Sequence, residues 1–173
     1  MTVDELTEYD VVRMTAEEMA GFLSSHSVGV LGLPTEGAPS LRPMSFWFDG
    51  ASTLYLLYVL GEGSRKADLS DRADVARFLV YSAETMFNWR SVLLTGTLDP
   101  VPESEWDEVQ AAVEDAWRPD VFRQAITDDN VGLYAFEIAD QTGLKSAGLP
   151  PAFERGAADE GDGDGDSDGG GDE

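Results

Sequence analysis

The chain has 173 residues with no cysteine and one histidine, and its 34 acidic residues outnumber 11 basic ones to give a formal charge of −23. This composition excludes disulfides, thiolate catalysis, and metal sites built from cysteines or several histidines of one chain. The charge also argues against nucleic acids and anionic membranes as partners, because both present negative surfaces.

The acidic excess is spread along the sequence. Nine acidic residues and one arginine lie from Glu154 onward, so residues 1–153 keep a formal charge of −15. An acidic, lysine-poor body is typical of a salt-rich cytoplasm, as in halophiles, and an ordinary acidic protein is the alternative. The N-terminal residues lack the order of a signal peptide, and no apolar run reaches the roughly 20 residues of a membrane span. We therefore expect a cytoplasmic protein.

The first expected element is a helix that begins at the capping box Thr15–Glu18. Its apolar face comes from side chains at i, i+3 and i+4 spacing, which are Met19, Phe22 and Leu23. We expect the helix to end near Ser24–Ser25. His26 lies at the junction with the next segment, where a turn or packing role is favoured over catalysis.

Six segments with β-type patterning come next in the chain. The expected strands are His26–Leu33, Leu41–Phe48, Thr53–Leu60, Val75–Tyr81, Ser91–Leu98 and Asn130–Ala139. Asp49-Gly50 is a hairpin signal, and the strand that follows it is apolar almost throughout, which indicates a central position. Six short strands favour a mainly β fold with flanking helices, namely a six-stranded antiparallel split barrel of Greek-key type.

Two further helical segments are expected between strands. Ser64–Ala73 is short and polar, and Ser104–Trp117 has apolar residues along one face. The folded domain is expected to span residues 1–153.

Residues 154–173 form an Asp- and Gly-rich segment with no large apolar side chain, so we expect an acidic disordered tail. Asp164, Asp166, Asp168 and Gly169 match four positions of a calcium-binding EF-hand loop, but the glutamate of its twelfth position is missing. A solvated tail is therefore favoured, and no metal site is expected.

The triplet Ser64-Arg65-Lys66 is the strongest candidate for a binding site. It follows an apolar strand and a Gly-Glu-Gly segment, and it opens the short helix. A helix start offers free amides and a partial positive charge, to which a hydroxyl, a guanidinium and an ammonium would add phosphate donors. The alternative is a capped surface helix with two solvated cations.

The order of these segments resembles the FMN-binding split-barrel family, which includes the pyridoxamine 5′-phosphate oxidases. Four segments carry the resemblance, from about Met14 to Leu98: the first helix with HSVGVLGL, Pro39–Phe46 with its Arg-Pro-Met-Ser stretch, Gly63–Lys66 with Ala67 and Leu69, and Trp89–Val92 with Gly96. The acidic composition suggests a haloarchaeal-type member.

The resemblance implies an FMN site and a homodimer with the flavin at its interface. Arg65 and Lys66 would hold the FMN phosphate, with Ser64 at the helix start. The ring system would lie along Arg42, Pro43, Met44 and Ser45, with Tyr58 and Val59 beside them and Arg90 and Ser91 approaching from the fourth segment. Each role has a structural alternative, such as an ion pair for Arg42 or an edge position for Pro43. Trp89 is expected to pack in the core.

The resemblance also implies a flavin-dependent oxidoreductase that acts on a small-molecule substrate or electron donor. A flavin performs the redox chemistry itself, so no catalytic acid, base or nucleophile is assigned. True pyridoxamine phosphate oxidases hold their substrate with a C-terminal Arg and His, whereas Asp140–Phe153 supplies one cation, Lys145, and no His. We therefore expect another substrate. The alternatives are a non-catalytic flavin- or haem-binding protein and a deazaflavin-dependent reductase.

Overall fold

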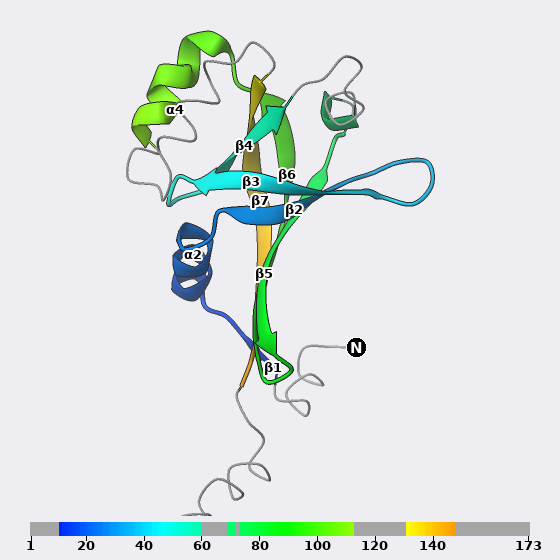
Figure 1. Ribbon diagram of the computed structural model, residues 1–173, viewed down its shortest axis with the longest axis vertical. Coiled ribbons are helices and arrows are strands. Elements are labelled where there is room, and N and C mark those ends of the chain that lie inside the picture. The colour runs from blue at the N-terminus through cyan, green and yellow to red at the C-terminus, as the bar shows by residue number, and fades with distance from the viewer. Residues whose placement is uncertain (1–10, 60–68, 72, 113–130, 148–173) are drawn as a thin grey trace, which may run out of the picture.

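The computed structural model describes residues 11–59, 69–71, 73–112 and 131–147, and these form a β-barrel flanked by few helices (Figure 1). Its strands are β2 (Val28–Leu33), β3 (Ser40–Phe48), β4 (Thr53–Val59), β5 (Ala76–Thr85), β6 (Asn88–Pro100) and β7 (Val131–Ser146). They pair antiparallel in the order β7-β4-β3-β2-β5-β6, and β6 pairs again with β7 to close the barrel. The expected six-stranded antiparallel barrel is confirmed.

Several strands extend further than their sequence patterns indicate. The β5–β6 hairpin continues to Thr85 and Asn88, and β7 runs on to Ser146, where the short strand β1 (Val11–Arg13) pairs with it. The added hairpin residues are mostly exposed. Exposed paired strands need no alternation of apolar and polar residues, so their sequence carries no strand signal.

Aromatic and aliphatic side chains fill the barrel interior. Phe46 and Phe78 meet edge to face, with ring centroids 5.3 Å apart and an interplanar angle of 77°. Gly29 lies where a Cβ atom would collide with the Phe78 ring, so the absence of a side chain there makes room for it. The core is therefore closely packed around large side chains contributed by facing strands.

Helix α2 (Ala16–Ser24) begins as its sequence predicts. The Thr15 hydroxyl accepts a hydrogen bond from the Glu18 amide at 3.2 Å, and the Glu18 carboxylate accepts one from the Thr15 amide at 2.9 Å. Met19, Phe22 and Leu23 are buried, which confirms the expected apolar face. Glu18 also pairs with Lys145, and this ion pair joins α2 to β7.

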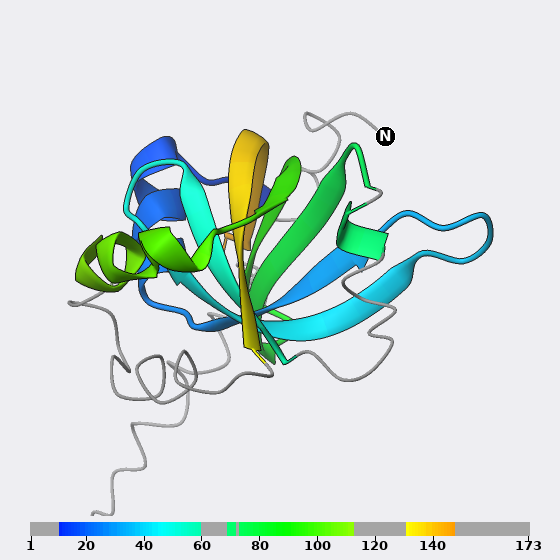
Figure 2. The ribbon, with the colours of Figure 1, turned by 90° about the horizontal axis from the view of Figure 1, so that it is seen from above.

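A second helix packs on the outer surface of the barrel. The 3-10 turn Glu103–Glu105 leads into α4 (Trp106–Ala112), and Val109 packs there in a cluster with Trp47 and Leu133. The expected helix Ser104–Trp117 is thus confirmed to Ala112, and its last residues lie outside the described part. Figure 2 shows α2 and α4 on one side of the barrel, with the β2–β3 hairpin projecting away from that side.

Of the expected helix Ser64–Ala73, the structure describes the end, where residues 69–71 are helical. No helix in the described ranges is long and apolar enough to span a membrane.

Candidate functional site

The Arg-Pro-Met-Ser stretch lies along the middle of β3. Arg42, Pro43 and Ser45 are exposed, and Met44 is buried with 5% of its surface accessible. The Arg42 guanidinium donates to the carbonyl of its neighbour Leu41 at 3.1 Å and forms no ion pair with any residue that the structure describes. The alternative of an ion pair with a strand acid is therefore absent from the described residues, and the remaining donors of Arg42 can serve a ligand.

The barrel opens beside this stretch. β3 and β4 pair through Phe46–Phe48 and Leu54–Leu56, whereas Ser40–Ser45 pairs with β2 and the end of β4 pairs with β7. The two strands diverge from their common hairpin in Figure 1. The edge of β3 that carries Arg42 and Pro43 is therefore not covered by a ladder to β4 in the described part of the chain.

Tyr58 lies near the end of β4, and its side chain points into the barrel. It is completely buried, its ring stacks on Tyr134 with centroids 4.2 Å apart, and its hydroxyl lies 2.7 Å from the Ser70 hydroxyl. Burial raises the pKa of Tyr58 to about 12, a rise that the Ser70 hydrogen bond opposes. A contact between Tyr58 and a cofactor at the surface would have to use its main chain; Val59 ends the same strand.

Ser64, Arg65 and Lys66 lie outside the described residues, so their role as a phosphate site stays a prediction. The chain after them is attached to the barrel at two points. The Ser70 and Tyr58 hydroxyls are hydrogen-bonded to each other at 2.7 Å. The Asp71 carboxylate accepts a hydrogen bond from the Tyr134 hydroxyl of β7 at 3.1 Å. These two contacts fix residues 69–71 against the strands that flank the opening.

Arg90 and Ser91 lie on β6, and β2 and β5 separate them from β3. Neighbouring strands are about 4.8 Å apart, so β3 and β6 are about 14 Å apart along the sheet. One chain therefore does not bring Arg90 next to Arg42. Between these two strands, the outer face of β2 and β5 carries Val30 and Leu79, whereas Arg42 lies on the face of β3 that also carries Met44.

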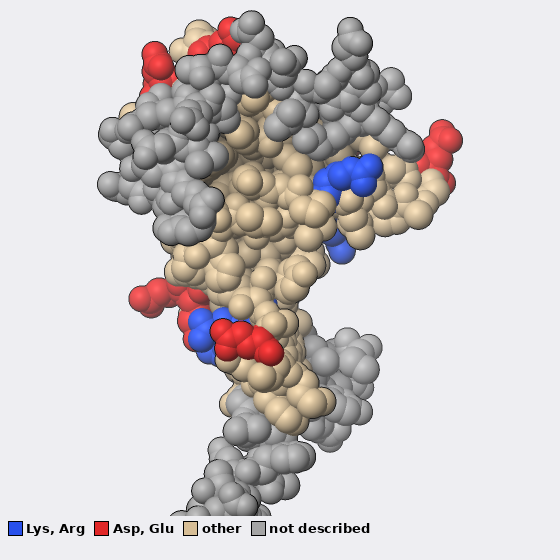
Figure 3. Space-filling view, viewed as in Figure 1, with Lys and Arg blue, Asp and Glu red and all other residues tan. Residues whose placement is uncertain are grey.

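That outer face is mainly apolar. Pro43 pairs with Val30, Val30 with Leu79, and Leu79 with Leu93, so one apolar row crosses four strands. The same face carries exposed large side chains, which are Val28 at 57%, Leu41 at 57% and Tyr81 at 58%. Figure 3 shows mostly uncharged side chains over the front of β2 and β3, with a basic patch toward the β2–β3 hairpin. Arg77 of β5 lies on the same face opposite Gly32, so the face is mainly apolar but also carries a cation.

Two hollows flank the tip of the β5–β6 hairpin and share Asn88, Trp89 and Arg90 as walls. The larger, about 810 Å³, lies toward β1 and Lys145, and the smaller, about 270 Å³, lies toward the end of α2. Trp89 is half-buried and lines both hollows, so the expectation that it packs in the core is wrong. It lies beyond the barrel, on the part of the hairpin that the sequence pattern did not reveal.

His26 occupies the smaller hollow. Its ring packs on Phe22 with centroids 4.1 Å apart, and its Nδ1 atom lies 2.8 Å from the Phe22 carbonyl. The expected packing role is confirmed. Glu84 and Asn88 of the same hollow are absent from the sequence-based candidates, because nothing local in the sequence indicates that they meet α2.

Comparisons with known proteins agree with the barrel. The family model described as pyridoxamine 5′-phosphate oxidase matches residues 15–145. No curated protein matches the chain.

Solved structures are similar at low sequence identity, which supports the fold alone. An FAD-binding protein from Mesorhizobium loti has a TM-score of 0.64 at 18% identity, covering 79% of this chain and 96% of that one. The FAD and heme binding protein from Mycobacterium smegmatis has a TM-score of 0.64 at 18% identity, with 86% and 80% covered. A flavocytochrome from Azotobacter vinelandii has a TM-score of 0.62 at 16% identity, with 88% and 77% covered.

Proposed function

Because this chain belongs to the pyridoxamine 5′-phosphate oxidase family, we propose that it is a flavin-binding protein with FMN as cofactor. Its reaction would be the oxidation or reduction of a small molecule. The observation that carries the proposal is the extent of the family match, since residues 15–145 include nearly all of the described barrel and all four segments that carry the resemblance. The flavin-binding proteins among similar structures support the same cofactor class.

The described residues fit a flavin in two respects. The Arg42 guanidinium is exposed and makes one hydrogen bond, to a main-chain carbonyl, so it has donors for the polar edge of a ring system or for an anion. The apolar row from Pro43 to Leu93 lies on the other face of β3 from Arg42 and offers apolar side chains of the kind that pack against an aromatic ring.

In this proposal the bound flavin supplies the transfer of hydride or electrons, and the protein positions it and limits access of water. Arg65 and Lys66 hold the phosphate, with Ser64 at the start of the helix. Arg42, Pro43, Met44 and Ser45 lie along the ring, Tyr58 and Val59 lie at its side, and Arg90 and Ser91 contact it from β6.

The flavin would lie at the interface of a homodimer. Two groups of proposed contacts are on β3 and β6 of one chain, with two strands between them. A second copy that packs on the apolar outer face would place its own β6 near the first copy's β3. A two-fold dimer brings the same face of each subunit together, so it would create two equivalent sites.

The double variant Arg65→Ala/Lys66→Ala tests the phosphate assignment. Titration of the flavin-free protein with FMN, followed by quenching of flavin fluorescence, gives the dissociation constant. We expect at least a tenfold weaker affinity than wild type with an unchanged melting temperature. Arg13→Ala serves as the control, because Arg13 is an exposed cation of β1 that is not among the proposed flavin contacts. Equal affinity in the double variant and the wild type would contradict the assignment.

Haem is the second candidate ligand, because two similar structures are a FAD and heme binding protein and a flavocytochrome. A deazaflavin on the same fold is a third. The absorption spectrum separates them, since haem has a sharp Soret band and a deazaflavin absorbs at shorter wavelength than a flavin.

A further inference from the structure

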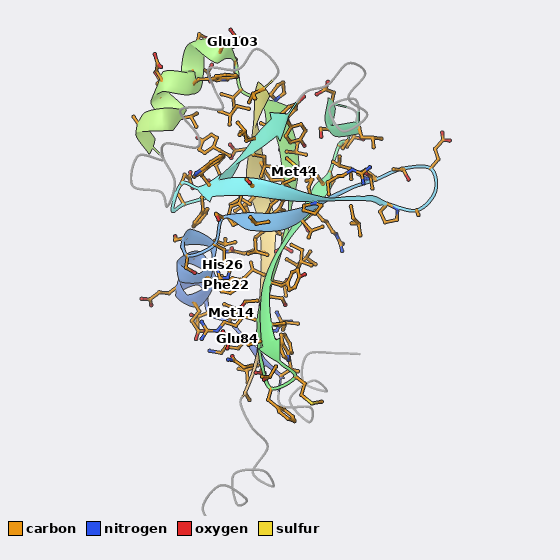
Figure 4. The ribbon with its side chains drawn as sticks, in the orientation of Figure 1. Met14, Phe22, His26, Met44, Glu84 and Glu103 are labelled. Carbon is orange, nitrogen blue, oxygen red and sulfur yellow. The ribbon has the colours of Figure 1, made fainter. Side chains whose placement is uncertain are left out.

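The smaller hollow is built entirely from described residues at the end of α2, on β5 and on β6. Phe22, Ser25 and His26 at the end of α2 face Glu84 of β5 and Asn88 and Arg90 of β6. Figure 4 shows Phe22, His26 and Glu84 along the same side of the barrel. Its volume of about 270 Å³ lies just below the range for drug-sized ligands, so it fits a small molecule.

The hydrogen bonds at the end of α2 fix the tautomer of His26. The Phe22 carbonyl can only accept, and it lies 2.8 Å from Nδ1. The Ser25 hydroxyl already donates to that carbonyl at 2.9 Å, so it accepts from Nδ1, 3.0 Å away. Nδ1 therefore bears the hydrogen, and the neutral ring presents Nε2 as an acceptor. Nε2 has no hydrogen-bond partner among the described residues.

A carboxylate, Glu84, and a guanidinium, Arg90, line the same hollow and form no ion pair with each other. Glu84 accepts a hydrogen bond from the Asn88 side-chain amide at 2.8 Å, which orients its carboxylate across the hairpin. Arg90 makes no ion pair with Glu84 or with another described residue, although its charge contributes to lowering the pKa of Glu18. The hollow thus offers one carboxylate, one guanidinium and one neutral acceptor.

We propose that this hollow binds a small zwitterion, an α-amino acid. The guanidinium of Arg90 pairs with the ligand's carboxylate through parallel hydrogen bonds. The ligand's ammonium donates to His26 Nε2 and to the carboxylate of Glu84. A ligand that carries both a carboxylate and an ammonium gives a partner to Arg90, His26 and Glu84. A ligand that lacks the ammonium leaves His26 and Glu84 without a partner, and one that lacks the carboxylate leaves Arg90 without one.

The inference deepens the proposed function, because Arg90 is also a proposed flavin contact and an amino acid held there would lie beside the flavin as its substrate. Binding in the hollow does not itself require the flavin. The two proposals can therefore fail separately, provided that flavin content and amino acid binding are measured on the same preparation.

The single histidine makes a direct test possible. In full-length protein with ¹⁵N-labelled histidine, long-range ¹H–¹⁵N spectra contain the ring signals of His26 alone. We expect a protonated Nδ1 and an unprotonated Nε2. L-alanine, added to about 50 mM to saturate a site with a Kd of about 1 mM, should shift the Nε2 signal along a saturating curve. Propionate lacks the ammonium and ethylamine lacks the carboxylate, so each should bind at least tenfold more weakly.

Variants of exposed residues locate the effect. Arg90→Gln and Glu84→Gln should each weaken the L-alanine response at least tenfold, while Arg77→Gln, which removes an exposed cation outside the hollow, should leave it unchanged. The inference is overturned if L-alanine gives no saturable shift, if propionate or ethylamine binds equally well, or if Arg90→Gln responds like the wild type. If the preparation shows flavin absorbance but L-alanine gives no His26 response, the amino acid site is rejected and the flavin proposal stands.

Discussion

At the scale of single residues, Tyr58 combines complete burial with a polar hydroxyl. Its pKa of about 12 lies above the ordinary value of 10, because burial disfavours the ionised form. A raised pKa means that the folded state resists ionisation more than the unfolded chain does. The stability that this contributes is fully present below pH 10 and is lost as the pH rises toward 12.

We therefore predict that the stability advantage of wild type over Tyr58→Phe shrinks by about 2 kcal/mol between pH 9 and pH 12, from 1.36 kcal/mol per unit of pKa difference. Urea unfolding of both proteins at each pH measures it. An advantage that stays constant over this range would show that the Tyr58 hydroxyl ionises normally.

Glycines at close contacts give a second residue-scale prediction. A Cβ atom at Gly96 would collide with the main-chain carbonyl of Glu137, at the β-bulge between β6 and β7. Gly96→Ala should therefore destabilise the protein by more than about 2 kcal/mol, since a backbone cannot yield as a flexible side chain does. The matched control is Gly21→Ala in α2, where a Cβ meets nothing within 4 Å. That change should stabilise by up to about 1 kcal/mol.

At the scale of elements, the capping box of α2 can be tested on its own. Thr15→Ala removes one hydrogen bond at the helix start and should cost about 1 kcal/mol of unfolding free energy. Thr15→Ser keeps the hydroxyl and should cost less. Chemical denaturation of the three proteins provides the comparison, and an equal loss in both variants would assign the effect to the Thr15 methyl group instead.

Elements with local signals were predictable from the sequence. The capping box marks the start of α2, and Asp49-Gly50 marks a hairpin whose glycine has a φ of 85°. The extensions of β5 and β6 toward their hairpin turn and of β7 to Ser146 could not be predicted, because exposed strands outside the barrel need no apolar pattern.

The candidate site was predictable only in part. Arg42 and Ser45 were expected on a strand and lie exposed on β3. The separation of β3 from β6, about 14 Å along the sheet, follows from strand order, and the hollow shared by His26 and Glu84 follows from the position of α2 beside the β5–β6 hairpin. No short motif encodes either.

At the scale of the whole molecule, the apolar outer face predicts self-association. Val28→Asp introduces a charge next to the row formed by Pro43, Val30 and Leu79, and it should convert the proposed dimer to a monomer of 18.7 kDa. Met86→Asp is the control, because Met86 is 77% exposed in the turn between β5 and β6 and is not part of the apolar row. Light scattering after size exclusion measures both. A dimer that persists in Val28→Asp would place the interface elsewhere.

The net charge predicts a dependence on salt. With a formal charge of −23, repulsion between carboxylates opposes folding, and salt screens it. We expect the melting temperature to rise as potassium chloride increases from about 0.1 M, where the Debye length is about 10 Å, to about 1 M, where it is about 3 Å. A melting temperature that does not change with salt would mean that the charges are too far apart to oppose folding.

The most direct test of the central claim, that this barrel holds a flavin, is the absorption spectrum of the purified protein followed by mass spectrometry of the released ligand. We predict a flavin band near about 450 nm and a released mass equal to FMN, with one flavin per chain. A colourless protein that also takes up no added FMN or FAD would contradict the account, and a Soret band without flavin would replace it with a haem protein on the same barrel.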